Sequence, residues 1–299
     1  MALVGASGNI GQRTLVRLIE HAIHDITVIV RPESLSQFPP EAAVTRLSFD
    51  DKDAIIQALR GREVLILQLG MGVTEYHKCF IEAAAEAGVK YIFPTEFGSD
   101  PEAKLVLELP EIIAKQEARD LIESLGVSRW VGVITNPWYD YCLSMGDVLG
   151  IDIKSRRATL WDGGQTKMSL STLQQAATAV AELAATSEDH LAQYANKCFY
   201  VTSFQASQRD ILKSIMLATD TTEKDWDIRD ELSKDVISKA NAMTGMDAHV
   251  IMLAKFFPLH FQEGLGGNFH DKVNDMQSLG MSEESFDSVT AVAVGKLGS

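Results

Sequence analysis

Cysteine, positive charge and long apolar runs are all scarce in this 299-residue sequence. The three cysteines, Cys79, Cys142 and Cys198, are odd in number and widely spaced. That spacing argues against both a disulfide framework and a cysteine metal site. We expect reduced thiols in or just below the core.

The shortage of positive charge excludes some partners. Lys and Arg total 27 against 41 Asp and Glu, for a formal net charge of −14. This argues against a nucleic-acid surface, which needs clustered Lys and Arg, and against docking on anionic membranes. No apolar run reaches the ~18 residues that span a bilayer, and no signal-peptide pattern opens the chain. We expect a cytoplasmic protein without nucleic-acid or membrane partners.

The first eleven residues carry the pattern around which the chain is organised. A short apolar strand runs into Gly-x-x-Gly-x-x-Gly, and an amphipathic helix follows. Such a turn brings a dinucleotide pyrophosphate onto a helix N-terminus. The spacing differs from Gly-x-Gly-x-x-Gly, so a glycine-rich turn without a ligand is the alternative. The expected cofactor contacts in this turn are Gly5, Ser7, Gly8, Asn9, Ile10 and Gly11.

Apolar runs alternate with helical patterns through the first half. The expected strands are 27–30, 44–49, 63–69, 89–93 and 127–134, and the expected helices are 52–59, 76–87 and 110–125, the last beginning at Pro110. Near-continuous apolar strands separated by helices indicate a parallel, doubly wound Rossmann sheet. We therefore predict an α/β fold, with residues 1–150 forming a dinucleotide-binding domain.

The alternation breaks near residue 136. A short antiparallel element is expected at residues 151–153 and 158–161, and an alanine-rich helix at 173–185. The acid-rich stretch 220–235 is interpreted as a solvated pair of helices. Residues 198–203 are expected to form a strand that returns to the main sheet. We predict that residues 151–299 mainly form a smaller, interwoven α+β substrate lobe.

Ligands of open α/β sheets lie at the carboxyl ends of the strands. The second expected strand is followed by Arg31, where NAD-binding sheets usually carry an acidic residue. A guanidinium can pair with a 2′-phosphate, which favours NADP(H). A solvated arginine is the alternative, and Glu33 is near enough to reach a ribose hydroxyl. Further expected cofactor contacts, within segments 68–72, 94–98 and 135–141, are Gln68, Leu69, Gly70, Thr95, Glu96, Asn136 and Pro137.

The usual catalytic pair of short-chain dehydrogenases is missing, because none of the six tyrosines has a lysine four residues on. The helix expected from Pro110 instead offers Lys115, with Arg119 on the same face. A lysine there could reach the nicotinamide ribose and a substrate oxygen, and polarise a carbonyl or donate a proton. The alternative is an ordinary exposed helix lysine.

Aromatic residues gather past the expected strand ends and again near residue 260. Aromatic walls near a cofactor suit a flat, largely apolar ligand, although an interdomain core is the commoner role for each such residue. For His260 we favour a satisfied polar residue of the lobe over a pocket acid or base. The predicted substrate contacts are Phe97, Trp138, Tyr139, Tyr141, Phe257 and His260.

Together, the GASGNIG turn, Arg31, the block 91–98 and the Lys115-x-x-x-Arg119 helix resemble the isoflavone reductase-like, NmrA-like branch of the atypical short-chain dehydrogenases. Residues 136–139, 150–152 and 203–209 are most similar to fungal members. The resemblance implies a Rossmann domain that binds NADPH, a lobe that closes over an aromatic substrate, and a catalytic role for Lys115, which also contacts the cofactor. One departure is Asp120 after Arg119, where plant members tend to carry paired arginines.

The resemblance implies an NADPH-dependent oxidoreductase of specialised metabolism, a monomer or homodimer. Its substrate would be an aromatic or polyketide-like small molecule with a conjugated alkene, quinone or carbonyl. Two alternatives stay open: a dinucleotide-sensing regulator without turnover, and a non-redox isomerase or dehydratase on the same fold. The presence of Lys115 argues against the regulator.

Overall fold

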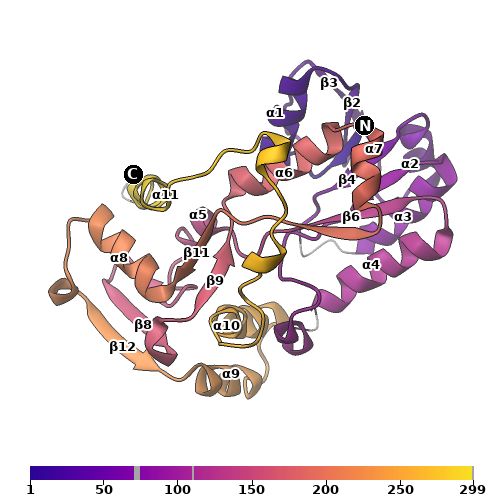
Figure 1. The fold of residues 1–299 in the computed structure, drawn as a ribbon. Coiled ribbons are helices and arrows are strands. Elements are labelled where there is room, and N and C mark those ends of the chain that lie inside the picture. The colour runs from indigo at the N-terminus through magenta and orange to yellow at the C-terminus, as the bar shows by residue number, and fades with distance from the viewer. Residues whose placement is uncertain (71–74, 110, 298–299) are drawn as a thin grey trace.

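A computed structural model describes residues 1–70, 75–109 and 111–297 of the chain. Its main body is a seven-stranded sheet in the order β10-β6-β5-β4-β1-β2-β3, with every neighbouring pair parallel (Figure 1). The strands are β1 (Ala2–Val4), β2 (Ile26–Val30), β3 (Ala42–Arg46), β4 (Val64–Leu67), β5 (Tyr91–Phe93), β6 (Arg129–Ile134) and β10 (Lys197–Tyr200). This arrangement confirms the predicted α/β, doubly wound parallel fold.

Helices cover both faces of this sheet because its strands are apolar on both sides. Helices α1 (Gly11–His21) and α6 (Leu173–Ala185) share one buried cluster with strand residues such as Leu3 and Val131. The other face carries α2 (Lys52–Leu59), α3 (Glu75–Ala87) and α4 (Glu111–Leu125). Helix α6 comes from the second half of the chain, so the two halves are interwoven.

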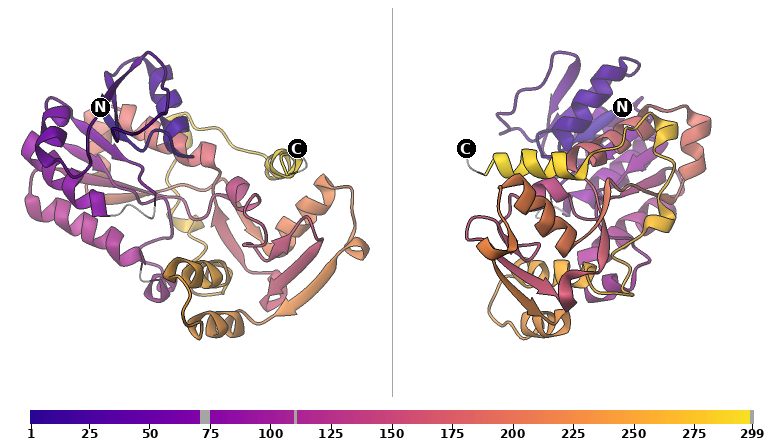
Figure 2. Two further views of the ribbon diagram at one scale, coloured as in Figure 1. Left: turned by 180° about the vertical axis from the view of Figure 1, so that it is seen from behind. Right: turned by 60° about the vertical axis from the view of Figure 1, so that its left-hand side comes forward.

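The second lobe lies beside the sheet, as Figures 1 and 2 show. It holds a three-stranded sheet in the order β12-β8-β7 and a two-stranded sheet, β11-β9. Its strands are β7 (Ile151–Asp152), β8 (Arg157–Trp161), β9 (Lys167–Leu170), β11 (Phe204–Ser207) and β12 (Asp227–Glu231). Its helices are α5 (Tyr139–Cys142), α8 (Gln208–Ala218), α9 (Ser233–Asn241), α10 (Ala248–His260) and α11 (Phe286–Gly295). The short helix α7 (Glu188–Leu191) precedes β10.

Two secondary-structure predictions need correction. The stretch 220–235 contains strand β12, which pairs in parallel with β8, so the predicted helix pair is wrong there. Its charged side chains are exposed on an edge strand, which hides the alternation that would mark a strand. The third strand of the main sheet is Ala42–Arg46 rather than 44–49. The expected antiparallel element is present as β7 and β8.

Polar contacts join the two halves just past the carboxyl ends of β5 and β10. The Tyr200 hydroxyl donates to Asp100 at 2.9 Å, and the Lys272 ammonium donates to the other carboxylate oxygen of Asp100 at 2.7 Å. Asp100 is only 4% exposed, so this ion pair holds residues near 270 against the loop after β5. Among the described helices, none combines the length and apolar character needed to span a bilayer. The three cysteines are free thiols.

Candidate functional site

The glycine turn after β1 is shaped by crowding of the main chain. Gly5 has a φ of +86°, and a Cβ there would lie 2.1 Å from the main-chain oxygen of Gln68. A Cβ at Gly11 would lie 2.0 Å from the oxygen of Gly5, so neither position admits a side chain. The Gly8 amide donates to the Gly5 oxygen at 3.0 Å, which closes the turn. The β1–α1 connection therefore passes unusually close to the end of β4.

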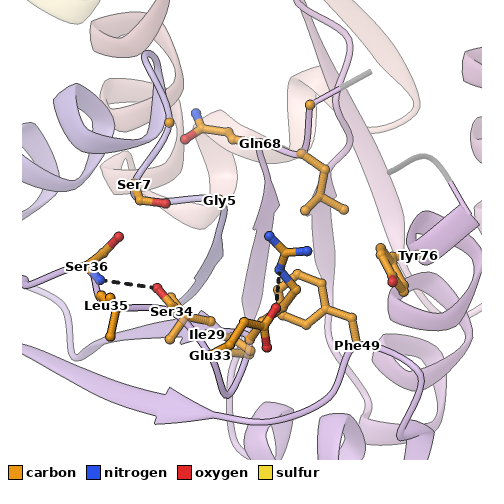
Figure 3. Close-up of a pocket in the computed structure, with 15 residues that line it drawn as sticks. Gly5, Ser7, Ile29, Glu33, Ser34, Leu35, Ser36, Phe49, Gln68 and Tyr76 are labelled. Atoms are coloured by element: carbon orange, nitrogen blue, oxygen red, sulfur yellow. Dashed lines mark hydrogen bonds and ion pairs between the residues drawn. The ribbon is translucent and has the colours of Figure 1, made fainter. Parts of the chain in front are cut away.

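A cavity of about 410 Å³ opens beside this turn (Figure 3). Gln68 faces it from the end of β4, and its Nε2 donates to the Thr14 hydroxyl at 2.9 Å. Its Oε1 is buried without a hydrogen-bond partner among the described residues. A bare glycine turn and the Arg31 guanidinium on one cavity fit a dinucleotide. The lining residues include Gly5, Ser7, Gly8, Arg31, Glu33, Ser34, Ser36, Gln68, Leu69 and Gly70.

Arg31 follows β2 and lies on the wall of this cavity. Its side chain is 54% exposed, and its Nε lies 3.3 Å from a carboxylate oxygen of Glu33. The Ser34 amide donates to the Arg31 oxygen at 3.1 Å, so the loop folds back and keeps Glu33 at the cavity. Both a cation and a carboxylate thus face the place where an adenosine ribose is predicted.

Thr95 links the ends of β4 and β5. Its hydroxyl donates to the Leu67 oxygen at 3.0 Å and accepts from the Leu69 amide at 3.2 Å. His77 Nε2 lies 2.9 Å from the same hydroxyl and must donate, because the hydroxyl proton is already used. No local pattern points to His77, because its contact joins helix α3 to the loop after β5. Gly72 and Pro110 lie outside the described residues.

Lys115 lies on α4 and turns back over the loop that follows β5. Its ammonium donates to the main-chain oxygen of Glu96. A Cβ at Gly98 would lie 2.7 Å from Lys115 Nζ, so the lysine occupies the space that this glycine leaves. Burial lowers the pKa of the Lys115 ammonium, the Glu96 carboxylate opposes this, and the Arg119 guanidinium adds to it. Lys115 is therefore not an ordinary exposed helix lysine.

The carboxylate of Glu96 is engaged elsewhere. It forms an ion pair of 2.5 Å with Arg119, and the two side chains are 3% and 5% exposed. Glu96 was expected to contact the cofactor, but its side chain is enclosed by this pair. Its main-chain oxygen holds Lys115 instead.

Three of the predicted substrate aromatics gather at one place. Phe97, Trp138 and Tyr141 are partly exposed and pack against a cluster that contains Ile10 of the glycine turn. The rings of Trp138 and Tyr141 meet edge to face, with centroids 6.0 Å apart. Phe97 has a φ of +34°, an uncommon conformation for an aromatic residue. An apolar surface thus adjoins the turn predicted to hold the cofactor.

Two other predicted substrate contacts belong to the core of the second lobe. Tyr139 is 0% exposed, and its ring stacks on that of Phe286. Its hydroxyl forms a hydrogen bond of 2.6 Å with the Thr290 hydroxyl. Phe257 is 3% exposed in the same cluster. Their burial corrects the expectation that they line a pocket, because no face of either ring is open to a ligand.

Asn136 acts as a clamp between the halves. It has a φ of +52°, and its amide nitrogen Nδ2 donates to the main-chain oxygens of Ser169 at 3.1 Å and Gly267 at 2.6 Å. Its Oδ1 is buried with no partner among the described residues. The neighbouring Pro137 is also buried. The two predicted cofactor contacts therefore lie beneath the loop surface.

His260 is fully buried at the end of α10. Its Nδ1 lies 2.7 Å from the Phe256 oxygen, to which it donates, and its Nε2 accepts from the Ser99 hydroxyl at 2.9 Å. Burial lowers the pKa of this imidazole to about 4. The favoured interpretation, a satisfied polar residue of the lobe, agrees with these contacts.

Comparisons with known proteins agree with this geometry. A family described as NAD(P)H-binding matches residues 5–133. The oxidoreductase aprR of Aspergillus flavus is 25% identical over 289 residues, which cover 93% of each chain. A solved structure described as AtPrR2 with NADP⁺ and (+)-pinoresinol superposes with a TM-score of 0.78 at 18% identity, over 98% of this chain and 97% of that one.

A second solved structure comes from work on pinoresinol-lariciresinol and phenylcoumaran benzylic ether reductases. It superposes with a TM-score of 0.79 at 20% identity, over 98% of each chain. The match to an NAD(P)H-binding family and the fold shared with the solved structures are in keeping with the predicted isoflavone reductase-like relationship and the predicted NAD(P)H cofactor. At such identities the solved structures speak for the fold, and the roles of individual residues stay predictions.

Replacing Gly5 by alanine tests the tight turn. The added Cβ would meet the Gln68 oxygen, so the turn must move and NADPH affinity is expected to fall at least about tenfold. Gly61→Ala is the matched control, because Gly61 also has a positive φ of +73° but nothing within 4 Å. It is expected to cost about 1 kcal/mol of stability and leave NADPH affinity unchanged, as measured by fluorescence titration.

His260 makes stability depend on pH. Because its pKa falls from 6.5 to about 4 on folding, its contribution is complete above about pH 6.5 and is lost as pH falls toward 4. We expect the free energy of unfolding to drop by about 2 kcal/mol between about pH 7.5 and about pH 5 from this group alone. The His260→Asn variant should lose correspondingly less in urea titrations at the two pH values. Equal losses would contradict the assignment.

Proposed function

We propose, from the match of residues 5–133 to an NAD(P)H-binding family and from the resemblance to isoflavone reductase-like, NmrA-like proteins, that this chain is an NADPH-dependent reductase of an aromatic or polyketide-like small molecule. The group reduced would be a conjugated alkene, a quinone or a carbonyl. The observation that carries this proposal is the position of Lys115. Its amine lies at the end of β5, on the loop that also bears Phe97.

The aromatic surface supports the choice of substrate class. Phe97, Trp138 and Tyr141 offer ring faces and edges to a flat ligand, and they adjoin Ile10 of the glycine turn. An aromatic ligand gains both apolar burial and ring-to-ring contact on such a surface. The curated fungal relative named an oxidoreductase and the solved neighbour that holds (+)-pinoresinol are in keeping with this class.

When bound, NADPH would supply a hydride. Lys115 would supply the matching proton, so that one hydride and one proton are added across the reduced bond. Its lowered pKa makes the ammonium a stronger acid than an exposed lysine near neutral pH. Phe97, Trp138 and Tyr141 would hold the ring and exclude water from the reacting bond.

Loss of the Lys115 amine tests this proposal. A screen of NADPH oxidation against quinones and enones first identifies an acceptor. With that acceptor, Lys115→Met is expected to lower kcat by about a hundredfold or more, because the proton donor is gone, while NADPH still binds. Lys104→Ala, at an exposed lysine of the segment before α4, is the control and should keep wild-type turnover.

Two results would count against the proposal. Wild-type turnover by Lys115→Met would remove the role of this lysine. NADPH binding without oxidation of NADPH by any acceptor in the screen would favour a dinucleotide-sensing regulator instead.

Replacing Arg31 tests the preference for NADPH. Arg31→Ala is expected to raise the Kd of NADPH about tenfold and to leave the Kd of NADH nearly unchanged, since only NADPH carries the 2′-phosphate. Glu33→Gln removes the carboxylate that competes for the guanidinium and should tighten NADPH binding. Equal effects of Arg31→Ala on both cofactors would mean that Arg31 only stacks on the adenine.

A further inference from the structure

We propose that Glu96 and Arg119 are positioning residues for Lys115, and that they balance the charge around its amine. This inference rests on the proposed reductase function. Glu96 accepts a hydrogen bond from Lys115, and Arg119 forms an ion pair with Glu96. Neither Glu96 nor Arg119 is expected to contact the reacting atoms. They act by holding the loop after β5 against α4 and by placing one negative and one positive charge beside the ammonium.

The geometry is that of a two-point clamp. Lys115 and Arg119 are four residues apart on α4, so their side chains leave the same face. Both reach Glu96: the lysine contacts its main-chain oxygen, and the arginine contacts its carboxylate at 2.5 Å. One loop residue therefore fixes two successive turns of the helix, and it cannot rotate about one contact without breaking the other.

Neighbouring residues leave space for the Lys115 and Glu96 side chains and fix the orientation of Arg119. Two glycines provide the space, since a Cβ at Gly98 would lie 2.7 Å from Lys115 Nζ and one at Gly132 would lie 3.2 Å from the Glu96 Cγ. The Arg119 guanidinium lies 5.5 Å from the Trp130 ring centroid, and its Nη2 donates to Gln116 Oε1 at 2.6 Å. The arginine thus has partners on three sides, and its orientation is determined.

The charges that act on the Lys115 ammonium are those of Glu96 and Arg119. The carboxylate favours the protonated amine, and the guanidinium disfavours it. With the two charges paired and nearly fully buried, their effects largely oppose each other, and little water is present to screen either one. Burial is left as the main influence on the pKa of Lys115, which it lowers.

Stability alone gives a weak reason for such a pair. Replacing a buried ion pair by apolar residues of similar volume is often neutral or stabilising, because both ions must be removed from water. A pair in which one member contacts a partly buried lysine and the other lies next to it has a second use. It keeps the amine in place without shifting its protonation strongly in either direction.

Opposite variants test this balance. The probe is the quinone or enone oxidant identified in the NADPH screen, and the readout is kcat/KM against pH, whose basic limb reports loss of the Lys115 proton. Glu96→Gln leaves the guanidinium uncompensated and should move this limb down by about one pH unit or more. Arg119→Gln leaves the carboxylate uncompensated and should move it up by a similar amount.

A second readout does not need turnover. Labelling of the Lys115 amine by acetic anhydride, followed by mass spectrometry at a series of pH values, gives the midpoint of its titration. The same opposite shifts are expected there. If wild-type protein turns over no acceptor, the proposed function fails, but the labelling midpoints still decide the present proposal.

Controls separate positioning from general stability. Glu182→Gln breaks a more exposed pair, that of Glu182 on α6 with Arg17 on α1 at 2.6 Å, and should move neither the basic limb nor the labelling midpoint. Arg119→Lys keeps the charge and is expected to hold the midpoint within about half a unit of wild type. Shifts of both single variants in the same direction, or no shift, would overturn the proposal.

Where a single variant fails to fold, the buried charge that it leaves unpaired is the cause. The double variant Glu96→Gln/Arg119→Gln then replaces it, with Arg119→Lys beside it. In the double variant the midpoint should stay within about half a unit of wild type, while kcat falls at least about tenfold because the clamp is lost. Wild-type kcat in a folded double variant would overturn the proposal.

Discussion

Parallel pairing of the strands is the constraint on which the candidate site depends. Because β1, β2, β4, β5 and β6 all point the same way, the residues that follow them meet at one edge of the sheet. One cavity at this edge is lined by the glycine turn, Arg31 and Gln68, and Thr95 and Asn136 follow strands that end at the same edge. Lys115 reaches the same edge from helix α4, which connects β5 to β6 in the chain.

Main-chain contacts do much of the positioning at this edge. Gly5 lies against the oxygen of Gln68, Lys115 binds the oxygen of Glu96, and Asn136 binds those of Ser169 and Gly267. A carbonyl group cannot be removed by substitution, so each contact survives a change of the residue that supplies it. The residues that reach these oxygens, Gly5, Lys115 and Asn136, are therefore the sensitive half of each pair.

Local patterns in the sequence were enough to predict the glycine turn, the place of Arg31 at the end of β2 and the place of Lys115 on α4, whose catalytic role stays a prediction. Each of these depends on residues within a few positions of one another. The ion pair of Glu96 with Arg119 and the contact of His77 with Thr95 could not be predicted, because they join different elements of the folded chain. Tyr139 shows the same limit. An aromatic residue that follows a strand has the same local sequence pattern whether its ring contacts a ligand or packs in the core. Strand β12 was missed because its exposed charges conceal its period.

Those charges on β12 have a consequence for the surface of the second lobe. The strand lies at the edge of its sheet, with hydrogen-bonding groups of the main chain on its outer side, where another strand could add. Asp227, Arg229 and Asp230 are exposed along it. A second copy in register would bring like charges opposite one another and lose the solvation of each. The sequence feature that obscured this strand thus also protects the protein from edge-to-edge aggregation.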